Sequence, residues 1–170
     1  QQNDLWRIER DENKQIIIMP PTNASTGIKN TNLLTELVIW NRRKKTGVCF
    51  DSSTGFTLPD GYVRSPDASW LTMEKWNQLS DNEKNQFAHI CPDFVIELKS
   101  KSDNLKSLTS KMGKWIKNGC SLAWLINPED NTVLIFRKNG TNDKVTGFNS
   151  TLSGEDVLPG FKLDLSILID

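Results

Sequence analysis

The feature that most constrains the fold of this chain is residues 94–126, whose pattern predicts a strand, a helix and a second strand. Residues 94–99 and 121–126 have the apolar density of buried strands. Residues 105–118 between them are predicted to form a helix, and Gly119 follows where a C-cap glycine belongs. Crossovers of this kind are right-handed and join parallel strands in nearly all proteins. This unit therefore predicts an α/β fold built around a parallel pair of strands.

The flanking segments predict further strands and one long helix. Before the central unit we expect a hairpin of residues 5–9 and 15–19, short strands at 47–50 and 55–58, a strand at 65–71 and a helical excursion at 73–79. Asn30 or Thr31 is expected to be the N-cap of a helix that runs to about Arg43. After the central unit, residues 132–137 should return antiparallel, followed by two or three short strands. With no internal repeat or linker, residues 1–170 are expected to form a single α/β domain with a mixed sheet.

The charge and the cysteine content limit the classes of function. Lys plus Arg and Asp plus Glu both number 21, so the molecule has no global attraction for a polyanion. Basic clusters occur at residues 42–45 and 99–117, although such clusters are usually solvated faces. The three cysteines are far apart in sequence, which argues against a disulfide framework or a cysteine zinc site and favours a cytoplasmic location. No apolar run approaches the roughly 20 residues of a membrane span, so no membrane partner is expected.

Two charged residues interrupt the otherwise apolar strand predicted at residues 94–99. Because side chains two residues apart share one face of a strand, Asp93, Glu97 and Lys99 should point the same way, with Val95 between them. Burying a carboxylate and an ammonium costs several kcal/mol per ion if both are dry. One interpretation is a Glu–Lys ion pair on an exposed edge strand. The other is a site where the carboxylate binds a metal ion and the lysine acts on a polarised water.

A second carboxylate lies at the start of another predicted strand. Asp67 follows Pro66 within the strand expected at residues 65–71. A Pro-Asp pair at this place can be turn chemistry alone. However, two carboxylates from adjacent strands, Asp67 and Glu97, would form a hard oxygen site suited to Mg²⁺ or Mn²⁺.

The pattern Pro66-Asp67 followed by Glu97-Leu98-Lys99 resembles the signature of the PD-(D/E)xK nuclease superfamily. The wider chain is more specific, and it resembles a bacterial family of restriction-endonuclease-like proteins that is common in cyanobacteria and grouped as a domain of unknown function. The segments that carry this resemblance are residues 17–21, 55–56, 58–61, 65–70, 92–102, 111–112, 119–128, 152–154 and 158–161. Because it covers nearly the whole chain, the resemblance implies a restriction-endonuclease-like mixed sheet flanked by helices, with extra N- and C-terminal β-strands.

The resemblance also implies a set of site residues. In such a site Asp67 and Glu97 would bind Mg²⁺ or Mn²⁺, helped by the backbone carbonyl of Leu98. Lys99 would orient or deprotonate the attacking water and stabilise the charge that develops on the phosphate. Asp93 would be a further ligand or an outer support of the ligands, and a structural role at the start of the strand is an equal alternative.

The chain departs from the superfamily pattern on its first core helix. Members often carry an acidic residue early in this helix, where this chain has Asn32. Glu36 lies one turn further on, about 6 Å along the helix axis, and is either a substitute ligand or a solvated carboxylate. A missing acidic ligand would weaken both metal binding and activity.

The sequence supports two functions of different classes. The first is a Mg²⁺-dependent endonuclease acting on DNA, for which a homodimer would suit the cutting of both strands. The second is an inactive nuclease-fold module that binds nucleic acid or a protein partner. Asp67, Glu97 and Lys99 favour the first, whereas the neutral net charge and Asn32 favour the second. A purely structural dimerisation domain would leave the three polar residues without a shared role.

Overall fold

The fold is built on a six-stranded mixed sheet. The computed structural model describes residues 7–11 and 14–169, so Leu5, Trp6 and the centre of the first expected turn lie outside the described residues. In spatial order the sheet contains β10 (Asn142–Thr146), β9 (Thr132–Arg137), β8 (Leu122–Asn127), β7 (Phe94–Leu98), β6 (Ala68–Thr72) and β3 (Gly47–Asp51). Strands β7 and β8 are parallel, and the other neighbouring strands are antiparallel.

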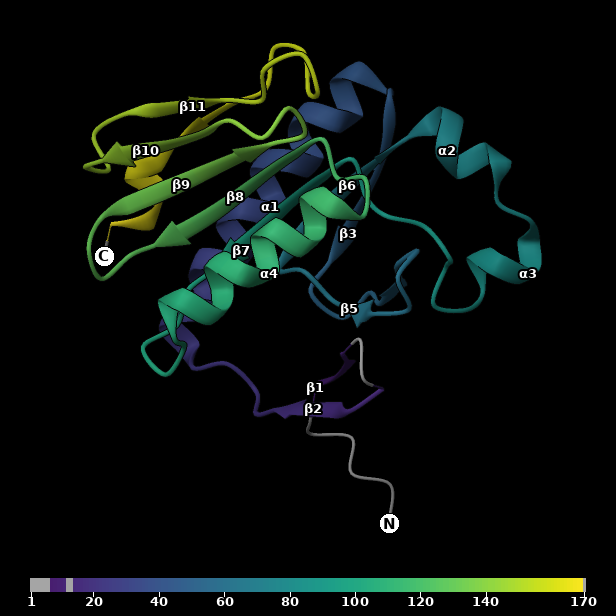
Figure 1. Ribbon diagram of the computed structural model, residues 1–170. Helices are drawn as coiled ribbons and strands as arrows, with labels where there is room; N and C mark the ends of the chain where they lie inside the picture. Colours follow the sequence, from purple (N-terminus) through teal and green to yellow (C-terminus); the bar gives the residue numbers. More distant parts are fainter. Residues whose placement is uncertain (1–6, 12–13, 170) are drawn as a thin grey trace.

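Two long helices cover the two faces of this sheet (Figure 1). Helix α4 (Leu105–Lys117) lies on one face and α1 (Ala24–Lys44) on the other. Because side chains alternate along β7, Phe94 and Ile96 pack in the core beneath α1, whereas Val95 packs in the core beneath α4. The predicted mixed sheet flanked by helices is confirmed.

The central unit β7–α4–β8 has the topology that its sequence pattern predicts. Phe94 pairs with Leu122, and the pairing continues in parallel register to the end of β7. Helix α4 starts after Asn104, whose side chain accepts a hydrogen bond from the Ser107 N–H at 3.1 Å. Gly119 ends the helix with a φ of +109°, a conformation that only glycine adopts at low cost. Strand β9 then returns antiparallel to β8, as predicted.

The first helix begins earlier than its sequence pattern predicts. Its N-cap is Asn23, whose side-chain oxygen accepts a hydrogen bond from the Thr26 N–H at 3.0 Å, so the prediction of Asn30 or Thr31 is wrong. Thr31 lies inside the helix, where its hydroxyl donates to the carbonyl of the residue four positions earlier. The first turn contains Ser, Thr and Gly, which are weak helix formers, so propensity alone conceals the true start.

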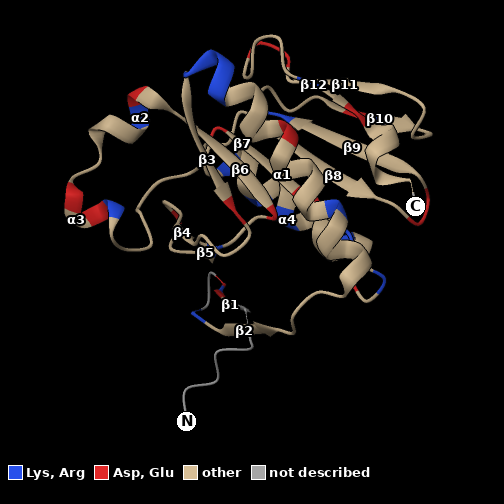
Figure 2. Ribbon diagram, turned by 180° about the vertical axis from the view of Figure 1, so that it is seen from behind, with Lys and Arg blue, Asp and Glu red and all other residues tan. Residues whose placement is uncertain are grey.

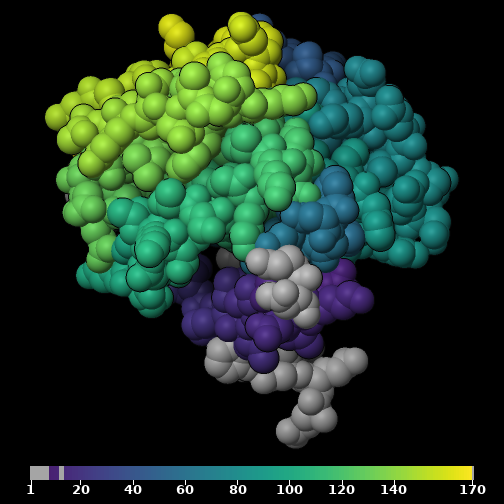
Figure 3. Space-filling view, viewed as in Figure 1, coloured from purple at the N-terminus to yellow at the C-terminus, as the bar shows by residue number. Residues whose placement is uncertain are grey.

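The N-terminal hairpin belongs to a second sheet. Its order is β2 (Ile16–Met19), β1 (Arg7–Arg10), β5 (Val63–Arg64) and β4 (Phe56–Thr57). Strands β1 and β2 are antiparallel. Strand β1 also pairs with β5, where Arg10 is opposite Val63. In Figure 3 the purple N-terminal segment borders the lower side of the green and teal body. The hairpin therefore belongs to a separate sheet that lies beside the central sheet and does not extend it.

Short elements complete the chain. The predicted helical excursion is α2 (Met73–Gln78) and α3 (Asp81–Lys84), and the C-terminal part contains β11 (Thr151–Ser153), β12 (Lys162–Asp164) and the 3-10 turn η1 (Leu165–Leu168). The strand expected at residues 65–71 begins only at Ala68, which leaves Asp67 at its entrance. All three cysteines are free thiols. Neither α1 nor any other helix in the described part of the chain combines the length and the apolar character that a bilayer crossing needs.

Candidate active site

A pocket of about 270 Å³ opens where β6 and β7 meet the hairpin and the start of α1. We call it the carboxylate pocket, and its lining includes Met19, Asn23, Thr26, Asp67, Glu97, Leu98, Asp103 and Lys111. Asp67 precedes β6 and Glu97 lies on β7, and these adjacent strands pair through Ala68 and Ile96. Figure 2 shows acidic and basic residues close together at this end of the sheet, next to α4. The structure thus brings Asp67 and Glu97 into one pocket.

Backbone and side-chain hydrogen bonds hold Asp67 in place. Its Oδ2 accepts the Leu98 N–H at 2.8 Å, and its Oδ1 accepts Asn30 Nδ2 at 3.3 Å. The N–H of Asp67 donates to the Ile96 carbonyl at 3.0 Å. The carboxylate is therefore fixed at the junction of β6, β7 and α1.

Glu97 is a buried carboxylate that is 4% exposed. Its Oε1 accepts Trp115 Nε1 at 3.0 Å, and Lys111 Nζ lies 2.8 Å from Oε1 and 3.0 Å from Oε2. Burial raises the pKa of Glu97 to about 7; Lys111 opposes this rise, whereas Asp67 and Glu9 add to it. Burial therefore favours the protonated form of Glu97 more than in an exposed glutamate.

An ionic network that the sequence pattern did not reveal supports Glu97. Lys111 Nζ lies 3.0 Å from Glu9 Oε1, and Arg64 Nη1 lies 2.6 Å from Glu9 Oε2. Burial by itself would raise the pKa of Glu9, but Lys111 and Arg64 outweigh it and lower the pKa. Burial would likewise lower the pKa of Lys111, but Glu97 and Glu9 outweigh it and raise the pKa. The network therefore keeps Glu9 and Lys111 ionised and ties the hairpin to α4 and β7.

Lys99 lies outside the carboxylate pocket. Its ammonium forms an ion pair with Glu129 and donates to the Ser100 carbonyl at 3.1 Å. The side chain lines an adjoining pocket instead. The Lys99 N–H still donates to the Ile126 carbonyl of β8 at 2.8 Å, so backbone pairing continues through this residue, but the ammonium end of the side chain lies in a different pocket from Glu97.

Three other residues considered from the sequence lie away from the carboxylate pocket. Asp93 lies at the opposite end of β7, where Oδ1 forms a 2.6 Å ion pair with Lys75. Glu36 borders a separate pocket at the other end of α1. Asn32 donates to the Ile167 carbonyl at 3.1 Å. Asp93 and Glu36 therefore both lie outside the lining of the carboxylate pocket.

The residue of α1 that reaches Asp67 is Asn30. Its Nδ2 donates to Asp67, while its buried Oδ1 has no hydrogen-bond partner among the residues that the structure describes. Within the same residues, no three His, Cys, Asp or Glu side chains form a ready metal cluster. Two carboxylates with an unused amide oxygen nearby nevertheless fit Mg²⁺ or Mn²⁺, since such ions often bind through one or two carboxylates and keep several waters.

The architecture that holds this pocket is a nuclease fold. The crystal structure of "a putative nuclease belonging to DUF820 from Anabaena variabilis ATCC 29413" is similar, with a TM-score of 0.81 over 95% of this chain and 88% of that chain, at 18% sequence identity. None of the curated proteins is significantly similar in sequence. The model of the Uma2 family, described as "Putative restriction endonuclease", matches residues 1–166, and the chain belongs to this family. The predicted family is confirmed, and family and fold together support a nuclease.

Proposed function

We propose that the protein is a divalent-metal-dependent endonuclease that hydrolyses phosphodiester bonds in DNA. The observation that carries this proposal is that Asp67 and Glu97, from two adjacent strands, line one open pocket. Membership of a restriction-endonuclease family supports nucleic acid as the substrate class.

In this proposal Asp67 and Glu97 hold Mg²⁺ or Mn²⁺, with the backbone carbonyl of Leu98 as a further oxygen donor. Such an ion lowers the pKa of a bound water and offsets the negative charge of the phosphate. The Leu98 N–H orients Asp67, and Lys111 with Trp115 orients Glu97. The two carboxylates are therefore positioned before substrate binds, which reduces the reorganisation needed for the reaction.

Two lysines are candidates to supply positive charge beside the phosphate, since Lys111 lines the carboxylate pocket and Lys99 lines the pocket that adjoins it. Lys111 is flanked by Glu9 and Glu97, so much of its charge is already compensated. Lys99 pairs with one carboxylate among the described residues, that of Glu129, whose side chain is 43% exposed, so less of its charge is compensated. We therefore give Lys99 the role of stabilising the developing charge, and Lys111 the role of positioning Glu97.

A second candidate function is a nuclease-fold module that binds nucleic acid or a protein partner without turnover. The observation that favours it is that both oxygens of Glu97 already accept hydrogen bonds from Lys111 and Trp115. The neutral net charge and the amide of Asn30, where a carboxylate would bind metal more tightly, favour it as well.

Calorimetric titration with Mg²⁺ and Mn²⁺ separates the two functions. Wild type, Asp67→Ala and Glu97→Ala would be titrated, and the same samples assayed for cleavage of supercoiled plasmid. We expect both variants to lose metal binding and nicking. Glu36→Gln, which removes a half-buried carboxylate outside the pocket, should keep both. Folded wild-type protein that binds no metal at millimolar concentration would overturn the enzyme proposal and leave the binding module.

We also propose that the protein acts as a homodimer in the cytoplasm. Three free thiols suit a reducing compartment. A two-fold pair would present one carboxylate pocket to each strand of a duplex. Light scattering after size-exclusion chromatography, with and without DNA, tests the dimer, and a monomer under both conditions would exclude it.

A further inference from the structure

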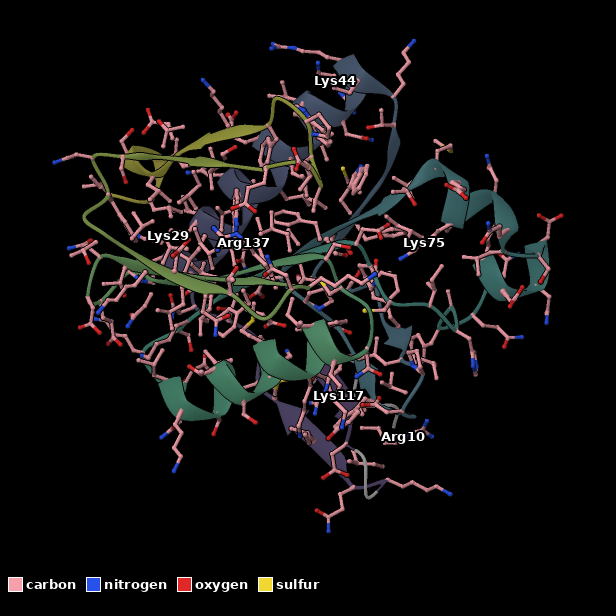
Figure 4. All side chains as sticks on the ribbon, turned by 45° about the horizontal axis from the view of Figure 1, so that its top comes forward. Arg10, Lys29, Lys44, Lys75, Lys117 and Arg137 are labelled. Carbon is pink, nitrogen blue, oxygen red and sulfur yellow. The ribbon has the colours of Figure 1, made fainter. Side chains whose placement is uncertain are left out.

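The side chain of Asn30 links α1 to the carboxylate pocket. Its Nδ2 donates to Asp67 Oδ1 at 3.3 Å, which is longer than an ordinary N–H···O hydrogen bond. Thr26, one turn earlier on the same face of α1, lines the pocket. In Figure 4 the labelled Lys29, which precedes Asn30, and Lys44 lie towards the two ends of α1, so Asn30 belongs to the end of the helix that borders the pocket.

The amide oxygen of Asn30 is unused. Among the residues that the structure describes, the buried Oδ1 has no hydrogen-bond partner, although the nitrogen of the same amide has one. A buried acceptor without a donor costs free energy, so nearly all such groups in folded proteins are paired. The Asn30 amide therefore satisfies Asp67 while its own oxygen stays unsatisfied.

Rotation of the Asn30 amide by about half a turn would exchange the positions of its oxygen and its nitrogen. Oδ1 would then face Asp67 Oδ1 at about the 3.3 Å that now separates Nδ2 from that atom. Two oxygens in this position repel each other unless a cation binds both. Neighbouring ligands of an octahedral Mg²⁺, with bonds of roughly 2.1 Å, lie about 3.0 Å apart. The present separation is therefore close to the one that a shared ion requires.

We propose that Asn30 is a further ligand of the metal ion, and that its amide turns when the ion binds and presents Oδ1 to it. This inference rests on the proposed function, because it takes Asp67 and Glu97 to hold Mg²⁺ or Mn²⁺. Amide oxygens are ordinary ligands of hard cations and carry no charge. With an amide in place of a third carboxylate, the ion keeps more of its positive charge for the phosphate of the substrate.

Terbium luminescence tests for this ligand directly. Tb³⁺ binds oxygen donors as Mg²⁺ does, and the indole of Trp115, whose Nε1 lies 3.0 Å from Glu97 Oε1, is close enough to transfer excitation to it. The decay rates in H₂O and D₂O give the number of water molecules on the ion. We expect the ion in Asn30→Ala to hold about one more water than in the wild type, because water takes the place of a lost ligand. Loss of a residue that only orients Asp67 would leave this number unchanged.

Calorimetric titration with Mn²⁺ gives a second readout. We expect Asn30→Ala to weaken Mn²⁺ binding about 10-fold and Asn30→Asp to tighten it about 10-fold, since affinity rises with the negative charge of the ligands. General disturbance of the fold would not produce a gain in affinity. In EDTA, Asn30→Asp should have a lower Tm than the wild type, because it places a carboxylate beside that of Asp67.

Asn32→Ala is the matched control. Asn32 is also a half-buried asparagine of α1, but it donates to the Ile167 carbonyl and does not line the carboxylate pocket. Its substitution should change neither the number of waters on Tb³⁺ nor the affinity for Mn²⁺. Circular dichroism checks that each variant is folded.

The water count separates this inference from the proposed function. Equal numbers of waters in the wild type and Asn30→Ala would overturn the inference, even in a protein that cleaves plasmid, because Asn30 would then only position Asp67. An added water in Asn30→Ala, in a protein whose wild type cleaves no plasmid, would sustain Asn30 as a ligand and overturn the nuclease. A folded wild type that binds neither Tb³⁺ nor Mn²⁺ would overturn both.

Discussion

Lys111 is the residue on which the buried ionic network depends. Its ammonium lies between Glu9 and Glu97, and its side chain is 14% exposed. Substitution of Lys111 by methionine would keep a side chain of similar length but remove the cation that the two buried carboxylates share. We expect Lys111→Met to lower the free energy of unfolding by about 3–5 kcal/mol in chemical denaturation. Lys117→Met, on the exposed side of the same helix, should change it by less than about 0.5 kcal/mol. Equal losses of unfolding free energy in Lys111→Met and Lys117→Met would show that the buried ionic network does not stabilise the fold.

Lys99 should affect turnover more than stability. We expect Lys99→Gln to lower kcat for plasmid nicking about 100-fold, because it removes a positive charge beside the developing negative charge. Metal binding measured by calorimetry should not change. Since Glu129 is 43% exposed, the loss of this ion pair should cost less than about 1 kcal/mol of unfolding free energy. If Lys99→Gln kept the kcat of the wild type, we would assign the stabilisation of the developing charge to Lys111 instead.

Glu97 gives the metal-free protein a pH dependence of known sign. Burial raises the pKa of Glu97 from 4.5 to about 7, so the folded protein binds this proton more tightly than the unfolded chain does. The stability contributed by this group is present below pH 4.5 and is lost as the pH rises to about 7. With a chelator present, the wild-type Tm should therefore fall more between about pH 5 and pH 8 than the Tm of Glu97→Gln. If the Tm of the wild type and the Tm of Glu97→Gln fell equally over this range, the raised pKa of Glu97 would be contradicted.

Single residues of the site differ in how far the sequence reveals them. Glu97 and Asp67 stand out because each is a carboxylate beside an apolar strand. Lys111 leaves a weaker signal, because it shares the helical spacing of the buried Met112 and Trp115 yet lies in a lysine-rich stretch. Glu9 and Lys111 are 102 residues apart, so no local pattern could pair them.

At the level of elements, the start of α1 is open to a direct test. The Asn23 side chain satisfies a backbone N–H in the first turn, whereas Thr31 lies inside the helix. We expect Asn23→Ala to cost about 1 kcal/mol of unfolding free energy and Thr31→Ala to cost less than about 0.5 kcal/mol. Denaturant titration of the two variants measures both. The reverse order would mean that the helix begins where the sequence pattern first suggested.

The elements that the sequence predicts well are those specified by local pattern. The unit β7–α4–β8 combines two apolar runs, a helix of the right length and a C-cap glycine, so each signal supports the same answer. The part that Asn30 plays in the site and the direction of Lys99 depend instead on contacts with other segments. Asn30 contacts Asp67, and Lys99 turns towards Glu129, and neither contact leaves a trace in local periodicity.

For the whole molecule, the site depends on segments that only the complete fold brings together. The carboxylate pocket takes residues from the end of the hairpin, the start of α1, β7 and α4. The sheet and the helices that hold these segments can be predicted from the sequence. The contact between the hairpin and the central sheet cannot, because it depends on buried ion pairs and leaves no apolar pattern. Loss of the overall fold should therefore abolish the site, and occupation of the site should in turn stabilise the overall fold.

Metal binding to this pocket should consequently raise the Tm of the protein. A ligand that binds only the folded state, at 100 times its Kd, adds about 2.7 kcal/mol to the free energy of unfolding. For a domain of this size that corresponds to a rise in Tm of roughly 5–10 °C. We expect differential scanning calorimetry to show this rise with saturating Mg²⁺ or Mn²⁺, its reversal by EDTA, and its absence in Asp67→Ala. The same rise in Asp67→Ala would place the ion elsewhere and remove the carboxylate pocket from the reaction.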